Sequence, residues 1–79
     1  MSGPQRLRLY YRSGCSLCED MQAELLGLQL KLEAIDIDGS EELVARYDHK
    51  VPVLTGVDDE EICHYFLDRE ALEGYLRRP

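Results

Sequence analysis

The chain has 79 residues, of which 44% are hydrophobic and 32% charged, and its net charge is −7. This length suits one small domain, and no apolar run approaches the roughly 20 residues that a membrane-spanning helix needs. An acidic surface repels phosphate backbones, which argues against nucleic acid as a partner. We therefore expect a soluble, cytoplasmic, monomeric protein with a single domain over residues 1–79 and no role at a membrane.

The first half of the sequence predicts a strand, a helix and a second strand. Residues 6–11 alternate between apolar and polar side chains, as a strand with one buried face does. A helix is predicted from residue 16 to about residue 26, with Gly27 as its stop, because apolar side chains recur at helical spacing at Leu17, Met21, Leu25 and Leu28. Residues 30–37 predict the second strand, with an irregularity near Ala34.

The second half predicts two more helices and, between them, a hairpin. Ser40 is a suitable N-cap for a short helix over residues 41–47. Residues 51–66 contain a short apolar run and an acidic turn, which together predict two antiparallel strands. Asp68 is suited to cap a last helix over residues 69–77.

The predicted order of elements is β-α-β-α-β-β-α, which indicates an α/β fold. A β-α-β start requires a crossover connection, so the first two strands should be parallel. The hairpin then adds antiparallel strands to the same sheet. We therefore expect a mixed four-stranded sheet with helices on both faces.

Two of the three cysteines, Cys15 and Cys18, stand three positions apart at the start of the first predicted helix. Residues at i and i+3 share one side of a helix, so the two sulfurs can approach disulfide distance. The unpaired N–H groups of a helix start also stabilise a thiolate. This placement indicates a redox dithiol in which Cys15 is the exposed nucleophile and Cys18 resolves the mixed disulfide.

Two other interpretations of the cysteine pair stay open. A zinc or iron–sulfur site needs more ligands, and the remaining candidates are Cys63, His49 and His64. Cys63 and His64 are neighbours on a predicted strand, so their side chains point to opposite faces and do not converge. We therefore expect no metal, and we expect Cys63 to be a core residue. In the third interpretation the cysteines only pack, inside a redox-inactive module for protein interaction.

The stretch from Tyr11 to Cys18, followed by a helix and later by Val51-Pro52 at a strand start, resembles the glutaredoxin family. The resemblance in element order covers nearly the whole chain, and it is strongest with short bacterial glutaredoxin-like proteins of uncharacterised function. It implies a thioredoxin-like fold and a disulfide oxidoreductase with a role in cell redox homeostasis. It also implies that Cys15 is the nucleophile and that Cys18 is the second cysteine of the redox-active centre.

The resemblance further implies a set of substrate-binding residues. It makes the Val51–Pro52 peptide bond cis and places it beside the active-site disulfide. A proline at the strand start leaves the backbone groups of Val51 available to an extended substrate. A basic residue of the family corresponds to Arg12, which is suited to stabilise a thiolate or hold a carboxylate. Asp68 corresponds to an acidic residue that helps to hold glutathione.

The reductant is less well defined by the sequence. The candidates are glutathione and a thioredoxin-reductase-like enzyme, and the expected substrate is a disulfide-containing protein or a small thiol. The family holds the γ-glutamyl end of glutathione at a Gly-Gly pair before the last helix, whereas residues 63–67 carry bulky side chains here. These side chains oppose close approach by glutathione. The carboxylates of Glu19 and Asp20 lie one turn beyond Cys15, and they oppose a thiolate there.

Overall fold

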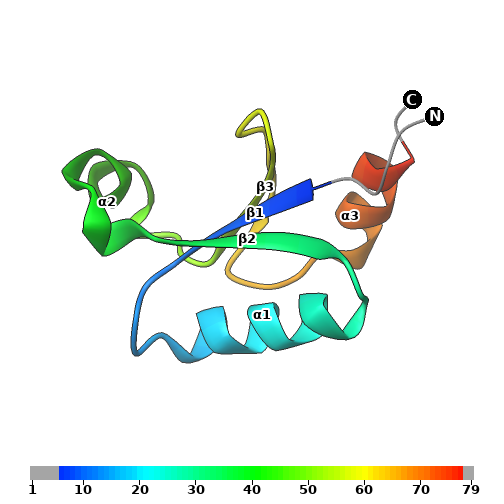
Figure 1. Cartoon of the computed structure of the whole chain (residues 1–79), viewed down its shortest axis with the longest axis horizontal. Helices are drawn as coiled ribbons and strands as arrows, with labels where there is room; N and C mark the ends of the chain where they lie inside the picture. The colour runs from blue at the N-terminus through cyan, green and yellow to red at the C-terminus, as the bar shows by residue number, and fades with distance from the viewer. Residues whose placement is uncertain (1–5, 78–79) are drawn as a thin grey trace.

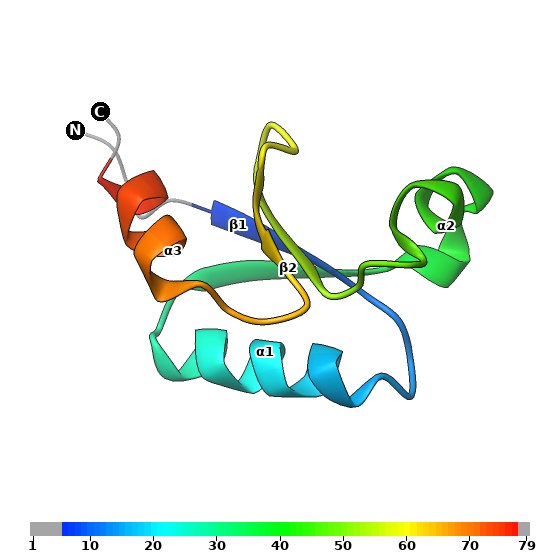
Figure 2. The ribbon, with the colours of Figure 1, turned by 180° about the vertical axis from the view of Figure 1, so that it is seen from behind.

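The computed structural model of the protein describes residues 6–77 and has one four-stranded sheet in the order β2-β1-β3-β4. The elements are β1 (Arg6–Tyr11), α1 (Ser16–Gly27), β2 (Lys31–Asp36), the short 3₁₀ helix η1 (Ile37–Gly39), α2 (Glu41–Tyr47), β3 (Val53–Gly56), β4 (Glu61–His64) and α3 (Arg69–Leu76). Figures 1 and 2 show α1 running along the sheet, with α2 and α3 at its opposite ends. The predicted element order is confirmed.

The sheet is mixed, as the crossover and the hairpin predict. Strand β1 is parallel to β2 and antiparallel to β3, so it is a central strand with partners on both sides. Strand β4 pairs antiparallel with β3, with an irregularity between Leu54 and Thr55. Because β1 and β2 are parallel, the segments that follow them, including the cysteine turn, lie at the same edge of the sheet.

Alternation along β1 divides the interior into two clusters, one on each face of the sheet. On one face, Leu7 and Leu9 pack against α1 and α3 in a cluster that also contains Met21, Leu25, Leu54, Cys63 and Leu72. On the other face, Tyr10 packs against α2 in a cluster with Ile37, Tyr47 and Val53. The rings of Tyr10 and Tyr47 stack with their centroids 4.5 Å apart. Helices therefore cover both faces, as predicted.

The ends of several elements differ from the sequence-based bounds. Helix α1 includes Gly27, which the sequence predicts as its stop, and ends there with Leu28 as its C-cap. The left-handed residue after the helix is Gln29, with φ of 60°. The second strand is shorter than predicted, because Ile37 begins η1, and it is regular at Ala34, which pairs with Leu9. Strand β4 ends at His64 rather than at residue 66.

Side-chain caps begin two of the helices as the sequence predicts. The Ser40 hydroxyl accepts a hydrogen bond from the N–H of Leu43 at 3.3 Å, and the Asp68 carboxylate accepts one from Ala71 at 3.0 Å. Helix α3 ends at Leu76, one residue before the predicted end. The predicted domain over residues 1–79 extends at both ends beyond the described residues, which are 6–77.

Gly56, at the end of β3, marks a tight contact between the sheet and α3. A Cβ atom at Gly56 would overlap the ring of Tyr75, whereas a Cβ at Gly74 would meet nothing. We expect Gly56→Ala to lower the free energy of unfolding by about 1–3 kcal/mol, because the ring must move out of a packed position. Gly74→Ala, in the interior of α3, should raise it by up to about 1 kcal/mol. Urea unfolding followed by circular dichroism measures both changes, and a Gly56→Ala variant as stable as the wild type would contradict the packing.

Candidate active site

Cys15 is the N-cap of α1, and its sulfur serves as the capping atom. The chain leaves β1 at Tyr11 and turns through Gly14, whose φ of 78° is one that glycine adopts without strain. The Cys15 Sγ atom then accepts a hydrogen bond from the backbone N–H of Cys18, with 3.1 Å between the heavy atoms. The Cys15 sulfur therefore lies at the positive end of the helix dipole.

Cys18 occupies a different environment one turn further along α1. Its side chain is only 2% exposed, whereas that of Cys15 is half-buried, and both are free thiols. Burial, together with the hydrogen bond to the Cys15 side chain, raises the pKa of Cys18 to about 11, although a backbone hydrogen bond from Arg12 opposes this rise. The charge of Glu19 contributes further to the raised pKa. The site therefore pairs an accessible sulfur with a buried, protonated one that contacts it.

Arg12 directs its guanidinium at a carboxylate of the protein itself. Its Nε and NH2 groups donate hydrogen bonds to Asp38 at 3.1 and 2.8 Å, which raises the pKa of Arg12. Arg12 nevertheless lines a cleft of about 360 Å³, next to Cys18, Glu19 and residues 11–14. The structure thus places Arg12 beside the cysteines, with its charge balanced by Asp38. Its predicted role in substrate binding stays a prediction.

The Val51–Pro52 peptide bond is cis, as the resemblance implies. Pro52 is buried and Val51 half-buried, where Val51 packs against the cluster around Tyr10. The Pro52 carbonyl accepts a hydrogen bond from the N–H of Tyr65 at 2.9 Å. Among the described residues, no backbone hydrogen bond involves Val51. The backbone groups of Val51 therefore remain available to an extended ligand.

Tyr65 is a site residue that the sequence analysis missed. It lies just after β4 with φ of 66°, a left-handed conformation that is uncommon outside glycine. Its hydroxyl donates a hydrogen bond of 2.6 Å to the His49 carbonyl, and its N–H bonds to Pro52. Tyr65 thereby fastens the loop between β4 and α3 to the segment before β3. The only sequence signal was that this stretch stands where the family has its glycine pair.

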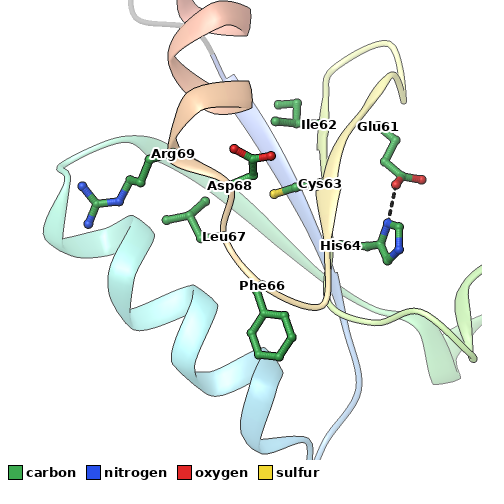
Figure 3. Close-up of a pocket in the computed structure, with 8 residues that line it drawn as sticks. All are labelled: Glu61, Ile62, Cys63, His64, Phe66, Leu67, Asp68 and Arg69. Atoms are coloured by element: carbon green, nitrogen blue, oxygen red, sulfur yellow. Dashed lines mark hydrogen bonds and ion pairs between the residues drawn. The ribbon is translucent and has the colours of Figure 1, made fainter.

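Asp68 lies at the end of this loop, beside residues of β4. It lines a cleft of about 570 Å³ with Cys63, Phe66, Arg69 and residues 61, 62, 64 and 67 (Figure 3). Its carboxylate caps α3. Cys63 is 9% exposed, and burial raises the pKa of its thiol, which agrees with the predicted core position. Among residues 6–77, Asp68 makes no hydrogen bond or ion pair with Cys15 or Cys18, so its predicted role in binding stays a prediction.

Among residues 6–77, no three His, Cys, Asp or Glu side chains converge in a way that would hold a metal ion. No helix in the same range is both long enough and apolar enough to cross a membrane.

The sheet order, the cis-proline and the cysteine-capped helix define a thioredoxin-like α/β domain. The sequence model of the glutaredoxin-like domain family (DUF836) matches residues 6–77, and the chain therefore belongs to this family. The solution NMR structure of protein Ne2328 from Nitrosomonas europaea is similar, with a TM-score of 0.85 and 46% sequence identity over 96% of this chain and 95% of that one. This similarity confirms the predicted fold. A comparison with curated proteins found no match.

The unequal burial of Cys15 and Cys18 predicts an order of reactivity. Brief treatment of the reduced, native protein with iodoacetamide at neutral pH should modify Cys15 first, because its sulfur is the accessible one. Cys18 should react at least tenfold more slowly, since its raised pKa keeps it protonated until the pH nears about 11. Peptide mass spectrometry measures the modification at each cysteine. Equal labelling of Cys15 and Cys18 in the folded protein would contradict the geometry. Labelling of the protein unfolded in urea is the control, because it shows how readily each cysteine is modified and detected without the fold.

Proposed function

We propose that the protein is a thiol–disulfide oxidoreductase whose active centre is the segment Cys15-Ser16-Leu17-Cys18. The observation that carries this proposal is the contact at the start of α1, where the Cys15 sulfur caps the helix and the buried Cys18 thiol adjoins it. A cysteine that only packed would not need the more exposed, helix-capping position. Membership of the glutaredoxin-like domain family supports the same chemistry.

The reaction is a transfer of two electrons through a mixed disulfide. The Cys15 thiolate attacks one sulfur of the substrate disulfide, the substrate S–S bond breaks, and the other substrate sulfur leaves as a thiolate. Cys18 then loses its proton and attacks the Cys15 sulfur, which forms the Cys15–Cys18 disulfide and releases the second substrate thiol. The protein is oxidised by two electrons, and the substrate is reduced by two. A reductant then restores both thiols.

Two of the predicted binding residues, Val51 and Arg12, suit an extended polypeptide substrate. Val51 lies in front of β3 with its backbone N–H and C=O free of hydrogen bonds within the described chain. A substrate strand can therefore pair with it as one more strand would. Arg12 lies in the cleft beside Cys18, so it is suited to bind a polar group of the substrate, although Asp38 competes for its guanidinium. Asp68 is suited to contact a ligand only on the β4 side.

The loop before α3 bears on the choice of reductant. Tyr65 takes the left-handed conformation at the place where the family carries glycine, and Phe66 beside it is 69% exposed. Two bulky side chains at this place would oppose the close approach of glutathione. We therefore favour a reductase protein of the thioredoxin-reductase type over glutathione as the physiological reductant. A reducing cytoplasm is the compartment in which such a dithiol would work.

Serine variants of the cysteines test the proposed function directly. Cys15→Ser should abolish disulfide reduction, because it removes the nucleophile. Cys18→Ser should form a mixed disulfide with a peptide substrate and then release the product at least a hundredfold more slowly, because no resolving thiol remains. Cys63→Ser, at a core position outside the pair, is the matched control and should retain the wild-type rate.

Mass spectrometry under non-reducing conditions distinguishes the mixed disulfide from the free protein. The metal content of each purified variant is measured in parallel. A fully active Cys15→Ser variant would contradict the redox function. Stoichiometric metal lost in the same variant would instead support the competing assignment, a metal or iron–sulfur binding module.

A further inference from the structure

A groove of about 140 Å³ lies between α1 and the loop that joins β4 to α3. Leu17, which lies between the two cysteines in sequence, forms its beginning, and Met21, Tyr65, Phe66 and Leu67 continue its apolar lining. Phe66 projects from the loop on the side of α1 (Figure 3) and is 69% exposed. An exposed aromatic side chain that borders a groove is typical of a surface that binds a partner.

The charges that border this groove favour a cationic partner. Asp20 and Glu24 line it, and Glu24 is already paired with Arg69 at 3.3 Å. Within residues 6–77, neither Asp20 nor Glu19 takes part in a hydrogen bond through its side chain or in an ion pair.

Three basic side chains of the described chain are also neutralised by ion pairs, the first being Arg69 with the groove residue Glu24. Arg12 is paired with Asp38, and Lys50 is paired with Glu61 at 2.7 Å. The unbalanced charge beside the cysteine pair is therefore negative, which matches the net charge of −7 for the whole chain.

We propose that this groove, between Leu17 and Phe66 and bordered by Asp20, selects polypeptide disulfides whose cysteine is flanked by an apolar residue and by Lys or Arg. This inference rests on the proposed oxidoreductase function and adds its substrate class. The apolar residue of the substrate packs against Phe66 and Leu17, and the cation pairs with the Asp20 carboxylate. Leu17 belongs to the first turn of α1, which Cys15 caps, so a substrate held in the groove has its disulfide near the end of the helix that carries the Cys15 sulfur. Glutathione disulfide, which is anionic, lacks both features.

The test uses two short peptides, each with one cysteine held in a disulfide with a chromogenic aromatic thiol. Both carry leucine beside the cysteine, and they differ only in having two lysines or two glutamates as flanking residues. Pre-reduced protein is mixed in excess with each peptide: Cys15 bonds to the peptide sulfur, and the aromatic thiol leaves and is measured by absorbance. Each rate is divided by the rate with dithiothreitol, a neutral dithiol, so that effects of the flanking charges on the disulfide itself cancel.

We expect the lysine peptide to react about tenfold faster than the glutamate peptide at low salt, and the ratio to approach one in high salt. Asp20→Asn should reduce this ratio about threefold, the effect of losing one exposed ion pair. Glu41→Gln, which removes a carboxylate from the exposed side of α2, is the matched control and should leave the ratio unchanged.

A second variant tests the apolar half of the groove. Phe66→Ala should lower the rate of reaction with both leucine peptides by about fivefold, because the contact between the ring and the leucine is lost. The same variant should not change the rate with peptides that carry serine in place of leucine. Val57→Ala removes another exposed apolar side chain, at the far end of the β3–β4 hairpin, and should change neither rate.

The outcomes separate this inference from the function on which it rests. Equal normalised rates for the lysine and glutamate peptides, or an unchanged ratio in Asp20→Asn, would overturn the proposed selectivity while leaving the oxidoreductase function in place. If the protein reduces neither of the two peptides and does not reduce glutathione disulfide, both the selectivity and the oxidoreductase function are overturned. A faster reaction with glutathione disulfide than with the lysine peptide would also overturn the selectivity.

Discussion

The hydrogen bond from the Cys18 backbone N–H to the Cys15 sulfur is the interaction on which the site depends. It requires a helix that begins at Ser16, and that start requires the left-handed turn at Gly14 directly after β1. Unequal burial then makes the two cysteines chemically different. The half-buried Cys15 sulfur accepts a hydrogen bond from one helix N–H, and Cys18 is buried with a pKa of about 11.

The remainder of the fold fixes the surroundings of this pair. Strand β1 is held on both sides by β2 and β3, so the turn that carries Cys15 emerges from a central strand. The loop before α3 is tied by Tyr65 to the carbonyls of His49 and Pro52, which keeps Phe66 beside the first turns of α1. The surface between Leu17 and Phe66 is therefore made by segments that are distant in sequence, and its unpaired charge, on Asp20, is negative.

The parts of this arrangement that depend on neighbouring residues could be predicted from the sequence. The strand alternation, the Ser40 and Asp68 caps and the placement of the cysteines at a helix start all follow from local spacing. The parts that depend on long-range contacts could not be predicted. Nothing local indicates that Arg12 binds Asp38, since the two residues meet only after the parallel strands pair. The conformation of Tyr65 was equally hidden, because sequence patterns associate left-handed residues with glycine.

The reduction potential of the cysteine pair tests the central claim most directly. The protein is equilibrated in dithiothreitol buffers of graded redox potential and quenched in acid, and its free thiols are counted by mass after alkylation. The account predicts one two-electron transition in which Cys15 and Cys18 lose their thiols together while Cys63 stays reduced. Three free thiols at every potential, or a disulfide formed through Cys63, would contradict it.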